Sequence, residues 1–438
     1  MNRRDFLKHV GVAGATAVMS GKSISRAQGQ SRPNILFIIA DDLGYSDLSC
    51  YGGKDIDTPN LDRLATEGVR LTSFYTAAPM CAPTRESIMS GRYPLRTGHT
   101  WPSPTNKGGL LPADTTLAEV LKGAGYRTCC VGKWHLGYPA EMHPRKQGFD
   151  EFYGVTSGSA DYYKHVYKDD KKWFFRQEEI CNDQGYMTDL LTNEAVAILE
   201  RQTKEQPFFL YLAYNAPHLP DQAPEEYMKS SRCGAFGAMV KCMEDGIGRV
   251  LDALEKKGLR DNTLVIFTSD NGGRRVEGNK PLRGGKGSLW EGGIRVPFIA
   301  RWPGHITPGS AVGEMAITTD LFTTLALIGG GKLPEGTIDG KDILPMIQGK
   351  AKTPHEYLCW RWRRTEKAKE GKNKSIPISA IRRGNMKLLR GQEKEDALYD
   401  LDADIGETKN LIKEKPEVAR ELGQVLDKWI ADAWDRKT

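Results

Sequence analysis

The sequence predicts an α/β fold in which helices sandwich a mostly parallel central sheet, with a smaller C-terminal antiparallel sheet and one helix after it. Two observations predict it. Before residue 340, short apolar runs alternate with segments of helical periodicity, and each run ends in polar residues. After residue 340, the chain carries several short strand-like runs and one long amphipathic segment. A chain of 438 residues has room for both parts.

The first 27 residues have the pattern of an export signal. The pair Arg3-Arg4 precedes a weakly apolar Gly/Ala/Val run that extends to Met19, and the small-residue site Ser25-Arg26-Ala27 follows. This segment resembles a twin-arginine signal peptide, which implies the twin-arginine translocase as a partner and a periplasmic or secreted protein. The alternative is a frayed amphipathic helix. No other apolar run approaches the roughly 20 residues of a membrane span, so we expect no stable membrane insertion.

Charge and cysteine usage exclude two classes of function. The formal net charge is +6, but the first 27 residues hold five basic side chains against one acidic, so the remainder is close to neutral. A nucleic-acid-binding role is therefore not expected. The eight cysteines form no Cys-x-x-Cys pair and have no paired histidines nearby, which argues against structural zinc. A disulfide could form after export, but the sequence leaves its pairing open.

Four apolar runs are predicted as strands buried on both faces of the sheet: 34–40, 127–131, 207–214 and 263–268. Each run is followed by polar or ionisable side chains that could act in catalysis or metal binding. Because the carboxyl ends of parallel strands meet at one edge of a sheet, we expect these side chains to share a rim. They are Asp41, Asp42, Lys133, His135, His218, Asp270 and Asn271.

Helices are predicted between these strands, at 116–125 and from residue 236 to 254. The alternation of strands and helices implies right-handed crossovers. A strand at 295–301 and an apolar helix near 321–327 follow. Two polar segments, 92–113 and 155–183, are candidate insertions that shape a substrate site.

A boundary is expected after the loop-like segment 329–340, giving a larger domain over 28–340 and a subdomain over 341–438. The smaller part is predicted to hold strands at 357–362, 379–383, 386–389 and 397–401 and a helix over 417–434. Residues 363–374 are predicted to be a charged, flexible loop.

The segment Cys81-Ala82-Pro83-Thr84-Arg85 is the candidate reactive centre. Proline is tolerated at the first helical position, and the free N–H groups of a helix start attract anions. Cys81 is therefore expected to face an anionic ligand. The alternative is a small buried apolar residue in front of a surface helix.

The remaining candidates divide into metal ligands and cations. The oxygen atoms of Asp41, Asp42, Asp270 and Asn271 suit Ca²⁺ or Mg²⁺; the alternative is a helix cap and a turn. Lys286 stands in a glycine-rich segment that permits close backbone approach. A cationic cup around a tetrahedral anion would consist of Lys286, Arg85, Lys133, His135 and His218, although a single histidine is more often a packing residue.

Taken together, these motifs resemble the formylglycine-dependent sulfatases of the alkaline-phosphatase superfamily. The likeness spans roughly residues 33–435 and includes Ser90-Gly91-Arg92, the segment 132–137, Asp270-Asn271-Gly272, Lys286 and the ending from 398 to 411. It implies a catalytic domain over 28–340 and a separate maturation enzyme that oxidises Cys81 to Cα-formylglycine (3-oxoalanine). It also implies one Ca²⁺, with Mg²⁺ as the alternative, held by Asp41, Asp42, the modified Cys81, Asp270 and Asn271. Thr84 departs from the commoner serine at that position of the motif.

The resemblance also implies a reaction. One hydroxyl of the hydrated formylglycine attacks sulfur, His218 protonates the leaving alcohol, and Lys286 neutralises the sulfate. His135 then deprotonates the second hydroxyl, which expels sulfate and regenerates the aldehyde, while Arg85 and Lys133 hold the modified residue.

The implied substrate is a sulfated carbohydrate, with aryl sulfates as surrogates. Residues 148–154 and 158–163 are similar to the N-acetylgalactosamine-4-sulfatase branch, in which Asp161 and Tyr162 would bind sugar hydroxyls; the alternative is a turn and a packing residue. Two other functions compete. One is a phosphatase or phosphodiesterase of the same superfamily, disfavoured by a cysteine at the nucleophile position. The other is a sulfated-glycan-binding protein with an unmodified Cys81.

Overall fold

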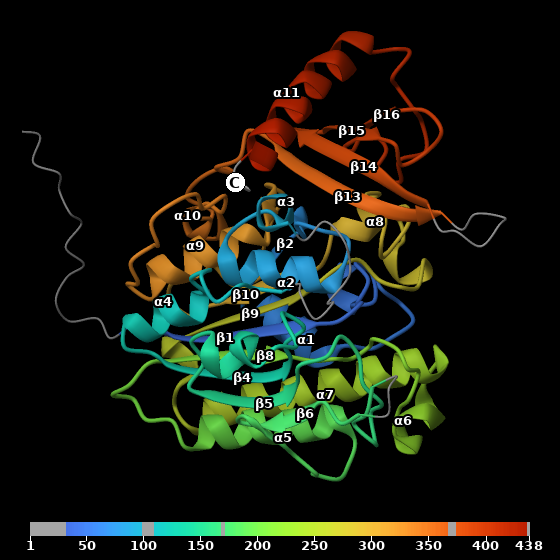
Figure 1. Cartoon of the computed structure of the whole chain (residues 1–438). Coiled ribbons are helices and arrows are strands. Elements are labelled where there is room, and N and C mark those ends of the chain that lie inside the picture. The colour runs from blue at the N-terminus through green and yellow to red at the C-terminus, as the bar shows by residue number, and fades with distance from the viewer. Residues whose placement is uncertain (1–31, 99–108, 168–170, 367–373, 436–438) are drawn as a thin grey trace, which may run out of the picture. The chain divides into compact units, whose positions relative to one another are not determined.

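The computed structural model describes residues 32–98, 109–167, 171–366 and 374–435 (Figure 1). The expected signal peptide lies outside this range. Residue contacts group Arg32–Thr438 as one compact unit. Among the described residues, we find no helix with the length and apolarity needed to cross a membrane.

A ten-stranded sheet forms the centre of the fold, in the order β11-β2-β10-β9-β1-β8-β4-β5-β6-β7. Its five middle strands, from β9 to β5, run parallel, which confirms the predicted fold class. β10 and β2 add antiparallel pairing on one side, and β6 and β7 do so on the other. The strands are β1 Asn34–Ala40, β2 Val69–Leu71, β4 Arg127–Lys133, β5 Glu151–Val155, β6 Phe174–Arg176, β7 Glu179–Ile180, β8 Phe208–Ala213, β9 Thr263–Ser269, β10 Phe298–Arg301 and β11 Ser310–Val312, with β3 Phe74–Tyr75 and β12 Ala316–Ile317 paired separately.

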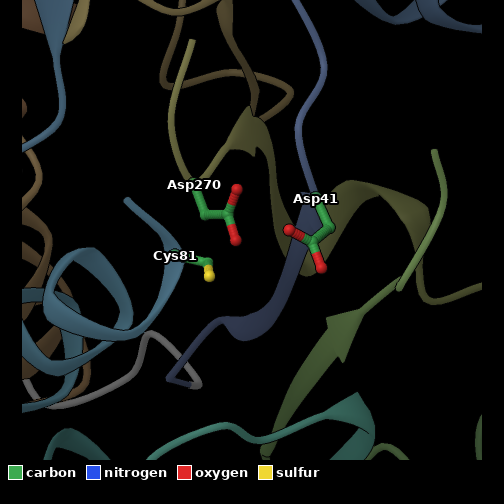
Figure 2. Close-up of side chains that lie close together, drawn as sticks. All are labelled: Asp41, Cys81 and Asp270. Atoms are coloured by element: carbon green, nitrogen blue, oxygen red, sulfur yellow. The ribbon is translucent and has the colours of Figure 1, made fainter. Parts of the chain in front are cut away.

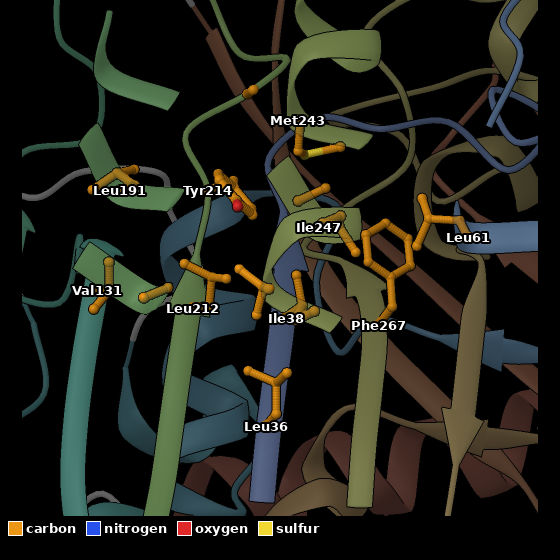
Figure 3. Close-up of a cluster of buried hydrophobic side chains, with 14 of the residues drawn as sticks. Leu36, Ile38, Leu61, Val131, Leu191, Leu212, Tyr214, Met243, Ile247 and Phe267 are labelled. Atoms are coloured by element: carbon orange, nitrogen blue, oxygen red, sulfur yellow. The ribbon is translucent and has the colours of Figure 1, made fainter. Parts of the chain in front are cut away.

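Helices cover both faces of this sheet because the side chains of each buried strand alternate between two cores. In β1, Ile35 and Phe37 pack with α2 Cys81–Ser90, α4 Leu117–Gly123 and α9 Thr319–Ile328. Leu36 and Ile38 point into the other core, which Figure 3 shows with Leu61, Met243 and Phe267. That core contains residues of α1 Pro59–Thr66, α5 Met187–Glu200 and α7 Gly234–Lys256. Each such side chain, once fully buried, contributes about 1.5–3 kcal/mol.

The shorter helices connect these layers. They are α3 Pro94–Thr97, α6 Glu225–Ser230, α8 Glu291–Ile294 and α10 Leu344–Ile347, together with the 3₁₀ turns η1 Ser49–Tyr51, η2 Ala140–Met142, η3 Pro144–Lys146, η4 Arg260–Asn262 and η5 Glu277–Asn279. The predicted strand at 295–301 is shorter than expected. It begins only at Phe298, because Pro297 has no N–H to donate, and before it Arg295 forms only an isolated bridge with Tyr75.

A four-stranded antiparallel sheet and the helix α11 Pro416–Asp435 make up the C-terminal part, as predicted. The strands are β13 Leu358–Glu366, β14 Lys374–Arg383, β15 Met386–Arg390 and β16 Ala397–Asp400. β13 and β14 pair as far as Glu366 and Lys374, so the segment predicted as a loop over 363–374 is strand at both ends. A solvent-facing edge hairpin tolerates such charged side chains, which sequence composition alone suggests belong to a loop.

Candidate active site

The carboxyl edge of the parallel strands gathers most of the predicted site residues. Asp41 directly follows β1, Asp270 directly follows β9, and Lys133 ends β4. His218 lies in the loop after β8, and the main chain of Asp41 donates to the carbonyl of Ala216 in that loop at 3.0 Å. The topology therefore unites groups that are more than 200 residues apart in sequence.

Cys81 is the first residue of α2, so Pro83 is the third helical residue and not the first. The side chain is 4% exposed, and burial raises the pKa of its thiol although Lys133 and Lys286 oppose this shift. The encoded side chain is thus a neutral thiol, a poor nucleophile. Figure 2 shows its sulfur beside the carboxylates of Asp41 and Asp270, and the possible ligand atoms of these three residues lie within 4.8 Å of one another. All eight cysteines of the chain are free.

Buried cations hold the carboxylates in place. Arg85 donates to Asp270 Oδ2 from Nε at 2.9 Å and lies 2.8 Å from the same oxygen through Nη2, while Nη1 donates to the Lys133 carbonyl at 2.9 Å. The Lys133 ammonium pairs with Asp41. Lys286 Nζ lies 2.5 Å from Asp42 Oδ1. Arg85 and Lys133 were expected to hold residue 81, but their contacts in the structure are to these carboxylates and to the main chain.

The two central carboxylates have opposite pKa shifts. Burial favours the neutral acid in both, but the charges of Lys133, His218 and Arg85 outweigh it at Asp41, so the pKa of Asp41 is lowered. At Asp270, burial and the negative charge of Asp41 dominate and raise the pKa to about 7. Two carboxylates that face one another in a buried site favour a cation between them.

The donor atoms fit a hard divalent cation. Asp41 Oδ1 and Asn271 Oδ1 are buried and have no hydrogen-bond partner in the described part of the chain. The Asn271 amide is fixed by donating from Nδ2 to Asp42 Oδ1 at 2.8 Å and to the Gly272 carbonyl at 3.0 Å. A second group of potential ligands is formed by Asp41, Asp42 and His218. Because oxygen donors predominate, this set suits Ca²⁺ and Mg²⁺ alike.

The two histidines differ in how they are held. His135 has a left-handed backbone with φ of 59°, and its pKa is lowered well below normal by burial, with Lys133 and Arg85 adding to the shift. His218 has a pKa lowered by burial, and its Nδ1 lies 2.8 Å from the Leu219 carbonyl. Since a carbonyl only accepts, Nδ1 carries the proton, and Nε2 is the atom 3.7 Å from Asp42 Oδ2.

Gly158 is a site residue that sequence reasoning missed. A Cβ atom built there would lie 2.3 Å from Nε2 of His135, so the glycine lets the imidazole pack directly against the main chain. Gly158 opens the segment 158–163 that the sequence resemblance singled out, but nothing in that segment identified the glycine as a neighbour of His135.

The expected sugar-binding pair has structural contacts. Tyr162 is fully buried, and its hydroxyl lies 2.8 Å from the Asn215 carbonyl and 2.9 Å from that of His218. It supports the His218 loop and is not among the residues that line the pocket, which fits the alternative of a packing residue; direct sugar contact stays a prediction. Asp161 does line the pocket, but its carboxylate accepts from the main-chain N–H groups of Tyr163 and Lys164 and from Gln222 Nε2.

A cavity of about 600 Å³ opens above these groups. Cys81, His135, His218 and Lys286 are among the residues that line it. The lining also includes residues 158–161, Lys164, Val166, Tyr167 and the pair Leu219-Pro220. The predicted insertion 155–183 therefore contributes to the pocket, and it also contains β6 and β7.

Two family models match this chain. Residues 33–330 match the one described as Sulfatase, and residues 285–432 match the one described as N-sulphoglucosamine sulphohydrolase, C-terminal. The chain belongs to the sulfatase family. The second match shows that the small C-terminal sheet is also part of this likeness.

Curated relatives of this sulfatase-family chain are themselves sulfatases. Human arylsulfatase A is 34% identical over 470 residues, which cover 93% of the chain and 89% of that enzyme. Human N-acetylgalactosamine-6-sulfatase is 38% identical over 346 residues, which cover 73% of the chain and 66% of that enzyme, so the chain spans about two thirds of its length. Neither is an N-acetylgalactosamine-4-sulfatase, and the expected placement in that branch stays a prediction.

Solved structures agree with the fold. The crystal structure of Ps i-CgsB has a TM-score of 0.85 at 33% identity, with 93% of this sulfatase-family chain and 94% of that chain covered. A phosphonate monoester hydrolase of Agrobacterium radiobacter shares the fold at 20% identity, with a TM-score of 0.69 and coverage of 92% and 96%.

Proposed function

We propose that this chain releases inorganic sulfate from a sulfated carbohydrate, using a Cα-formylglycine made from Cys81. The observation that carries the proposal is the pocket itself, in which Cys81 lies beside two buried carboxylates and faces Lys286, His135 and His218. A sulfate ester is a tetrahedral anion of the size and charge that such a cationic wall stabilises.

The state of Cys81 supports a modified nucleophile. A buried thiol with a raised pKa stays protonated near neutral pH, and the negative charges of the adjacent Asp41 and Asp270 raise this pKa further. Oxidation by a separate maturation enzyme would replace the thiol with an aldehyde, whose hydrate presents hydroxyl groups to the pocket.

Each surrounding group has a role in this scheme. Lys286 balances the charge of the bound sulfate, and His218, with its Nδ1 proton donated to a carbonyl, has Nε2 available to carry a proton to the leaving alcohol. His135 is held neutral and so can accept a proton from residue 81. Asp41, Asp42, Asp270 and Asn271 would hold Ca²⁺ or Mg²⁺, which when bound polarises the sulfate oxygens.

Support for a carbohydrate substrate comes from the relatives. One relative is an N-acetylgalactosamine-6-sulfatase, and Ps i-CgsB, at 33% identity, was crystallised with k-i-k-neocarrahexaose. A pocket of about 600 Å³ has room for at least a sugar ring around the sulfate.

The decisive experiment uses full-length protein expressed with a maturation enzyme. Mass spectrometry of the tryptic peptide ending at Arg85 should reveal conversion of the Cys81 thiol to an aldehyde, and sulfate should be released from 4-nitrophenyl sulfate and from sulfated oligosaccharides. Cys81→Ser should abolish turnover while the melting temperature stays near that of the wild type. Converted protein that releases no sulfate from any substrate would contradict the proposal, and glycan binding without turnover would favour a binding protein.

Export through the twin-arginine translocase is part of the same proposal, supported by the sequence pattern of the first 27 residues. Changing Arg3-Arg4 to two lysines should retain the protein in the cytoplasm of a bacterial host, because the translocase reads that pair. Cell fractionation and immunoblotting measure the outcome. Unchanged appearance of the variant outside the cytoplasm would exclude this route.

A further inference from the structure

The segment that carries Lys286 is fixed to the site on one side. Its main chain donates from Lys286 N to the Gly273 carbonyl at 3.2 Å and from Gly287 N to the Pro79 carbonyl at 2.8 Å. These two partners lie just after Asp270-Asn271 and just before Cys81. Small shifts of this segment therefore change the position of the Lys286 ammonium relative to residue 81.

The same segment is fixed on its other side by the C-terminal part of the chain. Leu289 N donates to Gln392 Oε1 at 3.0 Å, and Glu291 N donates to Glu407 Oε2 at 2.7 Å. The Arg283 guanidinium donates to the Glu407 carbonyl at 2.9 Å. Three points of the Lys286 segment are thus held by residues that follow it by about 100 positions.

A buried ion cluster strengthens this junction. Lys387 Nζ, on β15, lies 2.8 Å from Glu291 Oε1 and 2.9 Å from Glu407 Oε1, and all three side chains are fully buried. The second oxygen of Glu291 accepts from the Tyr75 hydroxyl at 2.6 Å and from Arg295 at 3.2 Å. Such a fully paired buried lysine has one well-defined geometry, because any displacement leaves a charge without a partner.

We propose that Lys387 and Glu407 are positioning residues for Lys286, so that the C-terminal sheet sets the geometry of the sulfate-binding cation. This inference rests on the sulfatase activity proposed above. Neither residue lines the pocket, so both act through the segment 283–291. Removing the Glu407 charge frees Lys387 from one partner and loosens the anchor at Glu291.

The test compares two variants that each remove a buried charge. Glu407→Gln keeps the shape of the side chain. The control, Arg301→Met, breaks the pair between the buried Arg301 and the partly exposed Glu67 (2.8 Å), which lies away from the C-terminal sheet. Both should melt at lower temperature. Only Glu407→Gln should lower kcat/KM for 4-nitrophenyl sulfate, by about 10- to 100-fold, and weaken inhibition by inorganic sulfate, because misplacement of a binding group by about 1 Å costs this much.

A double-mutant cycle with Lys286→Ala distinguishes an effect on the position of Lys286 from a general destabilisation of the protein. If Glu407 acts through Lys286, then Glu407→Gln should change kcat/KM little once Lys286 is already absent. An equal loss in both backgrounds, or no loss in the wild-type background, would overturn the inference. The milder change Gln392→Ala, which removes the Leu289 contact without touching a charge, should show the same pattern to a smaller extent.

Hydrogen exchange tests the inference without any assay of turnover. The amides of Lys286 and Gly287 should exchange faster in Glu407→Gln than in Arg301→Met, and unchanged exchange would overturn the proposal. If the converted wild-type protein is inactive but exchange responds as expected, the failure lies with the proposed activity and not with the coupling between the C-terminal sheet and the Lys286 segment.

Discussion

The conformation of His135 depends on the small size of its neighbour Gly158. His135 is packed against the bare main chain of Gly158 and adopts a left-handed conformation that non-glycine residues rarely use. Backbone strain of this kind persists only where the surroundings fix it, and here the surroundings are the buried site. The orientation of the imidazole therefore depends on the absence of a methyl group at position 158.

Gly158→Ala should lower kcat by roughly 10- to 100-fold, because the added Cβ, 2.3 Å from Nε2, forces the His135 ring to move. Steady-state kinetics with 4-nitrophenyl sulfate measure the effect. The matched control is Gly123→Ala at the end of α4, where an added Cβ meets nothing within 4 Å and activity should stay at the wild-type level. Wild-type kinetics in Gly158→Ala would show that the ring can adjust at no cost to catalysis.

Residue partners were the least predictable feature. The local sequence was enough to predict that Asp41 and Asp270 follow buried strands. The pairing of Arg85 with Asp270 and of Lys133 with Asp41 depends on which strands are adjacent in the sheet. Tyr162 is a similar case. Its aromatic ring and hydroxyl suit a sugar as well as a buried carbonyl, and only the tertiary structure decides between them.

At the scale of elements, continuous apolar runs were the most reliable signal. Residues 34–40 and 263–268 were predicted as strands, and β1 and β9 match them to within one residue, because a strand buried on both faces needs apolar side chains throughout. Strands with a polar face gave weaker signals. β14 begins at Lys374, five residues before its predicted start, since its first residues face solvent and share the composition of a loop.

Helix starts illustrate the same limit. Pro83 indicates that a helix begins nearby, yet the helix begins two residues earlier, at Cys81. The first N–H groups of a helix have no partner within the helix, so proline, which has no N–H, is tolerated at each of these positions. The sequence alone therefore does not show which of them Pro83 occupies.

At the scale of the whole molecule, cation binding should stabilise the fold. A cation that binds the native chain but not the unfolded one adds about 2.7 kcal/mol when present at 100 times its Kd. Chelation with EDTA should therefore lower the melting temperature, and added Ca²⁺ should restore it. Asp270→Asn, which weakens the ligand set, should respond less to both treatments. A melting temperature that is unchanged by EDTA and Ca²⁺ would contradict a cation at this site.

The order in which the ribosome synthesises the residues limits when the site can be complete. Cys81 and the carboxylates are complete once residue 271 has been synthesised, but the segment bearing Lys286 is anchored by Lys387 and Glu407, more than 100 positions later. A nascent chain still emerging from the ribosome therefore holds Cys81 and the carboxylates before the contacts that anchor the Lys286 segment can form. Translation itself would delay activity until the C-terminal sheet has formed.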